Sequence, residues 1–116
     1  MALQSYFVQM DDVLIIRLDG ELDHHATKEL KRRWQEAIER EDIQHIVLNL
    51  EHLTFMDSSG IGIILGRYKE IEAKNGEIVI CAVHPSVERL LTMAGIFKII
   101  RKEASEETAL LCLGGV

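Results

Sequence analysis

Residues 46–71 read IVLNLEHLTFMDSSGIGIILGRYKEI and join an apolar strand to a helix. The run Ile46–Leu50 is short, apolar and rich in branched side chains, which is typical of a buried strand. A helix is predicted to begin near Ser58, where Asp57 or Ser58 can accept hydrogen bonds from the free backbone N–H groups. A buried strand that leads into an amphipathic helix is the repeating unit of α/β folds.

The same alternation extends toward the N-terminus. Residues 13–18 predict a clear strand and residues 6–10 a weaker one, and the Asp11-Asp12 turn between them indicates an antiparallel hairpin. A helix is predicted from His24 to Arg40, with Asp23 as its cap and an apolar inner face. Strand, helix and strand in sequence imply a right-handed crossover and parallel pairing. Three ion pairs are expected on helix surfaces: Glu29 with Arg33, Glu36 with Arg40, and Glu70 with Lys74.

Toward the C-terminus the pattern predicts a strand over residues 78–81, a helix from Pro85 that ends at Gly95, an edge strand over residues 97–101 and a helix over residues 103–113. Together these elements predict an α/β fold in a single domain over residues 1–116. The sheet is expected to be mixed and mostly parallel, with four to five strands, an antiparallel edge hairpin and about four helices packed against it.

Composition excludes several functions. The 116 residues carry a net charge of −6, which argues against nucleic acid as a partner. The densest basic cluster, Lys31-Arg32-Arg33, is interpreted as a solvated helix face. No apolar run is long enough for a membrane span and the first ten residues do not resemble a signal peptide, so a cytoplasmic protein is expected. Cys81 and Cys112 lie among apolar neighbours and are expected to be buried thiols.

The start of the second helix is the most informative site. Capping explains one of its polar residues but not two adjacent serines, Ser58 and Ser59, followed by Gly60 and Gly62. Because glycine destabilises a helix by about 1 kcal/mol relative to alanine, these glycines indicate a close backbone approach. A hydroxyl at a helix N-terminus is a plausible phosphorylation site, since free N–H groups and the helix dipole tolerate a phosphate. A phosphate beside Asp57 would add negative charge and bulk, and so would prevent a partner from binding to this surface.

Other kinds of chemistry are less well supported. The spacing from Gly60 to Gly66 is GxGxxxG, one residue too long for a dinucleotide loop, and no phosphate-binding P-loop motif occurs. A hydrolytic triad would need a base beside the serines, and no GxSxG motif is present. His24 and His25 diverge on a helix and have no acidic cluster beside them, so no metal site is expected. The apolar stretch 93–97 either covers the sheet edge or contributes to a partner surface.

These motifs resemble the STAS family, the sulfate-transporter and anti-sigma-factor-antagonist domains, and most closely its sporulation members from endospore-forming bacteria. The resemblance covers nearly the whole chain and depends chiefly on residues 20–25, GELDHH, and residues 55–60, FMDSSG. It implies a regulatory protein without catalytic activity or cofactor. The unphosphorylated form would bind an anti-sigma factor that is also a serine kinase, and so release a sporulation sigma factor. Phosphorylation of Ser58, or alternatively Ser59, would end binding, and a PP2C-type phosphatase would restore it.

The resemblance also implies which residues meet the kinase. They lie in the two loops and in the first turns of the second helix: Asp23, His24, Asp57, Ser59, Gly60, Ile61, Gly62 and Leu65. Two other functions remain open from the sequence. One is a small-molecule or nucleotide-binding module, although the acidic loop and the missing phosphate motif count against it. The other is a scaffold subunit of a stress-signalling complex, which uses the same fold.

Overall fold

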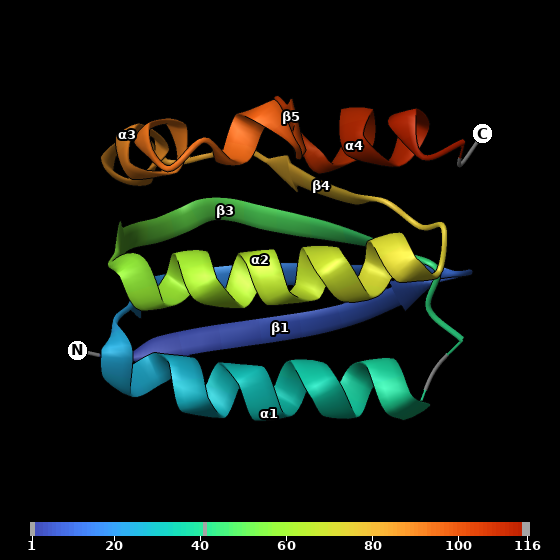
Figure 1. Ribbon diagram of the computed structural model, residues 1–116, viewed down its shortest axis with the longest axis horizontal. Helices are drawn as coiled ribbons and strands as arrows, with labels where there is room; N and C mark the ends of the chain where they lie inside the picture. The colour runs from blue at the N-terminus through green and yellow to red at the C-terminus, as the bar shows by residue number, and fades with distance from the viewer. Residues whose placement is uncertain (1, 41, 115–116) are drawn as a thin grey trace.

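The computed structural model describes residues 2–40 and 42–114 and shows one sheet with helices on both faces (Figure 1). The sheet has five strands: β1 Leu3–Met10, β2 Val13–Leu22, β3 His45–Met56, β4 Ile78–Cys81 and β5 Arg101–Glu103. Their order in space is their order in the chain. β1 pairs antiparallel with β2, and the other neighbouring pairs are parallel. The predicted α/β fold with an antiparallel edge hairpin is therefore confirmed.

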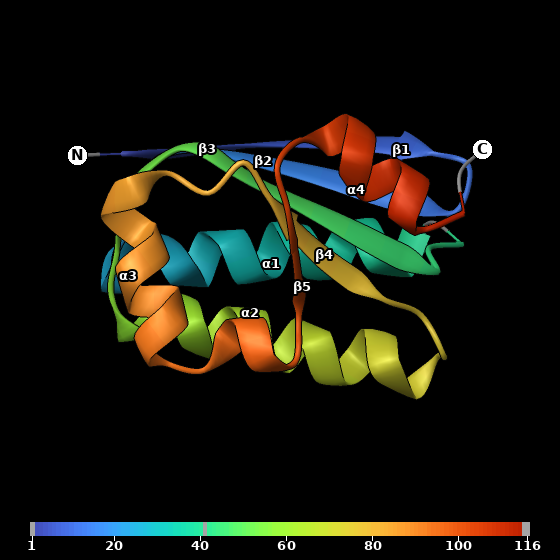
Figure 2. The same cartoon turned by 90° about the horizontal axis from the view of Figure 1, so that it is seen from above.

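The helices are divided unequally between the two faces of the sheet (Figure 2). One face is covered by α1 (His24–Arg40), α2 (Ser58–Ala73) and α3 (Pro85–Met93), with the short 3-10 helix η1 (Ile96–Lys98) following α3. The other face carries α4 (Glu106–Cys112). Since α1, α2 and α3 each follow a parallel strand, all three begin at the same edge of the sheet, where ligand and partner sites of such folds usually lie.

Alternation along β2 gives the sheet two apolar faces. Leu14 and Ile16 point toward the three helices, whereas Val13 and Ile15 join a smaller cluster under α4. The larger cluster includes Trp34 of α1, whose side chain has no exposed surface. A strand buried on both faces has to be apolar at almost every position, which explains why this part of the sequence does not alternate.

The segment after α3 differs from its prediction. Residues 97–101 do not form the edge strand; Ile96–Lys98 is a 3-10 helix, and the strand is Arg101–Glu103. Gly95 adopts a φ of 76°, which turns the chain and inserts Ile96 into the core. Apolar residues of this segment thus anchor a turn to the core and do not form a strand. Ala94, which follows the last turn of α3, is exposed.

The last helix begins at Glu106 rather than at Glu103. Ser105 is its cap: the Ser105 Oγ accepts from the Thr108 backbone N–H at 3.2 Å, and the Thr108 hydroxyl accepts from the Ser105 N–H. This reciprocal pair is a capping box with threonine in the place of the usual glutamate or glutamine. Of the two cysteines, Cys81 is buried as expected and burial raises its pKa to about 12, whereas Cys112 is only half-buried.

Two predicted helix-surface ion pairs are replaced by tertiary contacts. Arg33, expected to be solvated and to pair with Glu29, turns toward β1. Its Nη1 donates to the Ser5 carbonyl at 2.9 Å, and its guanidinium lies 5.0 Å from the centre of the Phe7 ring. Lys74 likewise donates to a backbone carbonyl, that of Ile43. Acceptors supplied by distant segments outweigh the weak attraction of an exposed i,i+4 pair.

The third predicted pair is also wrong. Glu36 pairs with Arg32 at 2.7 Å, and Arg32 also pairs with Glu29. Arg40, the expected partner of Glu36, donates instead to the Glu36 backbone carbonyl at 3.3 Å. All these side chains lie on the outer face of α1, where ion pairs contribute little to stability.

A polar network fastens α4 to the sheet. The Arg17 guanidinium donates to both carboxylate oxygens of Glu106, at 2.6 and 2.9 Å, and the Asn49 amide donates to the same carboxylate at 2.7 Å. The hydrogen bond from Arg17 holds the pKa of Glu106 below its ordinary value. The Glu106 side chain is only 22% exposed, so solvent screens this pair less than a surface pair.

The network predicts a pH-dependent contribution to stability. Because the folded pKa of Glu106 is lowered, its contribution is present above the ordinary pKa of glutamate and is lost as the pH falls through the folded value. We expect Glu106→Gln to lower the free energy of unfolding by about 1 kcal/mol at neutral pH and to have little effect near pH 3. Urea unfolding of both proteins at the two pH values measures this. A difference that stays constant with pH would contradict it, and Glu107→Gln, on the exposed side of α4, is the control.

Candidate functional site

Two aspartates form the junctions between strand and helix at the carboxyl edge of the sheet. Asp23 is the one residue between β2 and α1, and Asp57 is the one residue between β3 and α2. The preceding residues, Leu22 and Met56, are partners in the parallel pairing of β2 with β3. The register of two central strands therefore brings the two sequence motifs together, as predicted.

Asp57 ties the two junctions to each other. One carboxylate oxygen accepts from the Ser59 backbone N–H at 2.9 Å, which makes Asp57 rather than Ser58 the N-cap of α2. The other oxygen accepts from the His24 backbone N–H at 3.0 Å, and the Asp57 N–H donates to the Leu22 carbonyl at 3.3 Å. One side chain thus satisfies free N–H groups at the starts of both α1 and α2.

Asp23 caps α1 in the same manner. Its carboxylate accepts from the Ala26 backbone N–H at 2.9 Å, and this bond lowers the pKa of Asp23 from its ordinary value. Asp23 is therefore a carboxylate at neutral pH, close to the start of α2. The junction carries this negative charge before any modification.

The bridging role of Asp57 leads to a prediction for stability. Asp57→Ala removes the cap of α2 and leaves the His24 N–H without its acceptor, so we expect the free energy of unfolding to fall by about 1–2 kcal/mol. Denaturant unfolding measures the change. Asp57→Asn keeps one acceptor oxygen, enough for one of the two bonds, and is expected to recover about half of the loss. If Asn were as destabilising as Ala, the hydrogen bonds would not be the cause.

The two serines have different surroundings. Ser58 is the first residue of α2 and is exposed, and among the described residues its hydroxyl has no hydrogen-bond partner. Ser59 is half-buried; its N–H is held by Asp57 and its Oγ lies 3.5 Å from Nδ1 of His24. The hydroxyl that is accessible to another protein is that of Ser58.

The two glycines of the motif serve different purposes. Gly60 is buried, and a Cβ placed on it would lie 2.6 Å from Cγ of Met56 and 3.0 Å from Cδ2 of Leu22. The predicted close approach is therefore with the strands of the chain itself. Gly62 is exposed and a Cβ there would meet nothing within 4 Å. The fold does not require glycine at position 62.

The outer face of α2 is unusually apolar for a helix with a solvent-facing side. Helical spacing places Ser58, Gly62 and Leu65 in one outward row, with Ile61 beside it. Ile61 and Leu65 are half-buried, and Gly62 is exposed. Over its first two turns α2 is apolar or small on every side, a pattern that indicates a helix covered by something on each of its faces. We call the surface formed by Ser58, Ile61, Gly62 and Leu65 the α2 outer face. No other element covers it in the described residues.

One exposed aromatic residue close in sequence to Ser58 is not among the predicted site residues. Phe55 lies at the end of β3 and is 45% exposed. The strand predicted over residues 46–50 continues through Met56. The available signal was a large aromatic residue directly before a polar motif, since partner surfaces are enriched in exposed aromatic side chains.

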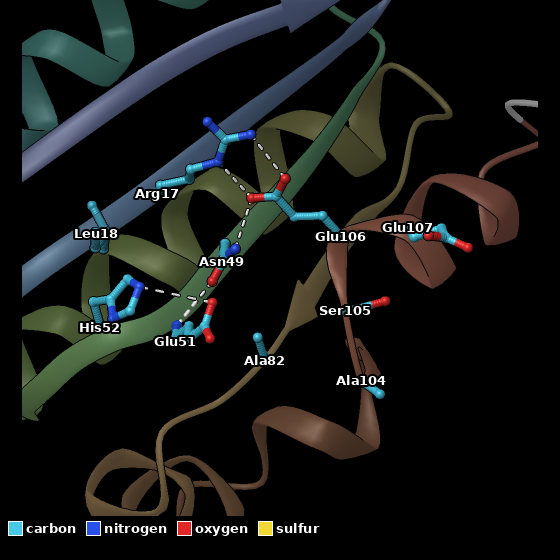
Figure 3. Close-up of a pocket in the computed structure, with 10 residues that line it drawn as sticks. All are labelled: Arg17, Leu18, Asn49, Glu51, His52, Ala82, Ala104, Ser105, Glu106 and Glu107. Atoms are coloured by element: carbon cyan, nitrogen blue, oxygen red, sulfur yellow. Dashed lines mark hydrogen bonds and ion pairs between the residues drawn. The ribbon is translucent and has the colours of Figure 1, made fainter.

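A sizeable cavity lies away from this site. It has a volume of about 470 Å³ and opens between β3 and α4, on the other face of the sheet (Figure 3). Arg17 and Asn49, which line it, donate to Glu106, and the side chains of Glu51 and His52 lie 3.8 Å apart. No unpaired set of cations is available there for a nucleotide phosphate, which counts against the nucleotide-binding alternative.

Two general properties concern residues 2–40 and 42–114. No helix in these ranges is both long enough and apolar enough to cross a bilayer. The same ranges bring together no group of three or more side chains of the kinds that bind metal ions.

Comparison with known proteins assigns the family. The sequence profile of the STAS domain matches residues 7–109. The anti-sigma F factor antagonist of Paenibacillus polymyxa is 51% identical over 110 residues, which cover 95% of this chain and 94% of that protein. The chain belongs to the STAS family. A second STAS relative, the anti-sigma F factor antagonist of Lysinibacillus sphaericus, is 36% identical over 105 residues, covering 90% of this chain and 89% of the relative.

Solved STAS structures show the same architecture. The anti-sigma factor antagonist SpoIIAA in its unphosphorylated form superposes with a TM-score of 0.84 at 35% identity, covering 99% of this chain and 98% of that one. Phosphorylated SpoIIAA from Bacillus superposes with a TM-score of 0.72 at 35% identity, covering 94% and 96%. The resemblance inferred from the sequence motifs is thereby confirmed. The named STAS relatives have regulatory rather than catalytic roles.

Proposed function

We propose that this chain is an anti-sigma factor antagonist. Its unphosphorylated form binds an anti-sigma factor that is also a serine kinase, and this binding frees a sporulation sigma factor. The chain is a ligand and a kinase substrate in this scheme, and it catalyses nothing itself. Because sigma factors act on RNA polymerase, the exchange takes place in the cytoplasm.

The observation that carries the proposal is the α2 outer face with Ser58 at its start. Ile61, Gly62 and Leu65 offer a small apolar surface on which a partner can pack closely. Asp23, His24 and Asp57 border this surface at the strand–helix junctions. Buried aromatic and aliphatic anchors within a polar rim are typical of protein interfaces.

Ser58 is the proposed site of modification. Its hydroxyl oxygen attacks the γ-phosphorus of ATP in the kinase, the bond to the β-phosphate oxygen breaks, and ADP and the hydroxyl proton leave. A PP2C-type phosphatase hydrolyses the phosphoserine with water and returns serine and inorganic phosphate. The exposure of Ser58 favours it over Ser59, whose hydroxyl faces His24.

The phosphate acts on the surface and leaves the fold intact. At the first position of α2 it lies at the positive end of the helix dipole, so the helix tolerates it. Toward the partner it adds a charge of about −1.5 to −2 to a junction that already holds Asp23 and Asp57. Bulk and repulsion at the centre of an interface weaken binding strongly.

A direct experiment tests the proposal. The purified chain is incubated with ATP and the sporulation anti-sigma kinase, and any phosphate is located by fragment mass spectrometry. We expect one phosphate on Ser58 and loss of kinase binding by the modified protein. Phosphate on Ser59 alone would overturn the residue assignment. If neither serine were phosphorylated and the chain failed to bind the kinase, the proposed function would be wrong.

A further inference from the structure

A second surface lies beside the α2 outer face, in the groove between α1 and α2. The groove has a volume of about 280 Å³. Its walls come from both helices: Thr27, Lys28 and Lys31 from α1, and Ser59, Gly62, Ile63, Gly66 and Arg67 from α2. Since Ser59 and Gly62 also belong to the proposed partner site, the groove is continuous with it.

Two glycines keep this groove open. Gly62 and Gly66 are one helical turn apart, and a Cβ built on either would meet no atom within 4 Å. Neither glycine has a positive φ, so the backbone does not require them. Any larger side chain at position 66 would extend into the groove, and the absence of one leaves the backbone of α2 accessible from this side.

The charges of the groove all have the same sign. Its charged residues are Lys28, Lys31 and Arg67, in a chain whose net charge is −6. Lys28 and Lys31 are exposed, and neither has a hydrogen bond or an ion pair with a residue in the described ranges. Arg67 is only 9% exposed; its Nη1 donates to Gln35 at 2.8 Å, and its Nε lies 3.5 Å from Oε1 of Glu70 in an ion pair. The two lysines are therefore available to a ligand.

We propose that this groove receives an acidic segment of the anti-sigma factor, which rests on the function proposed above. Carboxylates of the segment pair with Lys28 and Lys31, and its backbone lies over Gly62 and Gly66. Charge complementarity selects this occupant, because an anionic chain with a local cationic groove attracts acidic groups there and repels basic ones. The arrangement also adds to the effect of phosphorylation, since a phosphate on Ser58 lies at the mouth of the groove and repels the same carboxylates.

The test combines charge reversal with groove filling. Lys28→Glu/Lys31→Glu is expected to weaken binding of the intact chain to the anti-sigma factor at least tenfold by calorimetry, and to reduce the dependence of the dissociation constant on salt. The control is Arg89→Glu/Lys98→Glu, which has the same change of net charge on the exposed surfaces of α3 and η1. The control is expected to change affinity less than threefold.

The groove-filling variant is Gly66→Met. Methionine is the better helix former, so the melting temperature should rise by about 2–5 °C while affinity falls at least fivefold. A loss of binding in a more stable protein cannot result from unfolding.

Three outcomes would overturn the inference. If both groove variants bound like the wild type while Ser58→Asp had lost binding, the groove would be empty in the complex and the proposed function would stand. If the charge-reversal variant alone bound like the wild type, the two lysines would make no contact with an acidic segment and the inference would be wrong. If even the wild type failed to bind, the proposed function would fail together with this inference.

Discussion

The Ser58→Asp variant is expected to bind the anti-sigma factor about 30- to 1000-fold more weakly than the wild type, because like charges brought together in an interface cost several kcal/mol. The added carboxylate directly follows Asp57 at the junction that also holds Asp23, and it cannot be solvated once a partner covers the α2 outer face. Ser58→Ala removes only an exposed hydroxyl without a hydrogen-bond partner among the described residues. It is expected to bind as tightly as the wild type and to resist phosphorylation.

The stability of the fold should change little on either substitution of Ser58. An acidic residue in the first turn of a helix is stabilising by about 0.3–1 kcal/mol, which offsets part of the repulsion from Asp57. We therefore expect the melting temperatures of the Asp and Ala variants to lie within a few degrees of the wild type.

Calorimetric titration with the anti-sigma factor measures the affinities. Ser86→Asp is the matched control, because Ser86 is an exposed serine in the first turn of another helix, α3. It adds the same charge away from the α2 outer face and should leave affinity unchanged. Equal binding by Ser58→Asp and the wild type would show that charge at this position is not the switch.

Gly60→Val is expected to lower the free energy of unfolding by about 1–3 kcal/mol, a range typical of overpacking a filled core. The first new carbon would lie 2.6 Å from Cγ of Met56, and the valine methyl groups would extend farther into the contact with Leu22. Both neighbours end the two central parallel strands, so a shift of either moves the Asp23 and Asp57 junctions. The variant should thus lose partner binding as well as stability.

The control for this prediction is Gly66→Val, a substitution of the same kind in the same helix. Because a Cβ at Gly66 meets nothing within 4 Å, it should leave stability unchanged or slightly raised. Urea unfolding separates the two. Equal stabilities would mean that Met56 and Leu22 move aside freely and that Gly60 is not required for packing.

Most of the fold could be predicted from the sequence because the central strands and first two helices have strong local patterns. The strand–helix alternation from β2 to α3 follows from apolar runs, from caps at Asp23 and Asp57, and from Pro85 at the first position of α3. The segment after Gly95 could not be predicted in this way. A short apolar run there packs as a turn, because the chain has to reverse before β5 can pair with β4.

The site divides along similar lines. Asp23, Asp57 and Ser58 could be placed together because residues that follow neighbouring parallel strands meet at one edge. The reason for glycine at position 60 could not be predicted, because the clash of a side chain there with Met56 depends on the distance between α2 and β3. The contact of Arg33 with β1 could not be predicted from helical spacing either, because its acceptor, the Ser5 carbonyl, is 28 residues away in the chain.

The strand order described above has a consequence for how the chain is synthesised. Each strand pairs only with the strand before it and the strand after it in sequence. A nascent chain that leaves the ribosome from its N-terminus can therefore add one strand at a time to an edge that already exists. No strand has to wait for a later one to be inserted between two neighbours. Such growth avoids long loop closures and shortens the time for which apolar edges are open to aggregation.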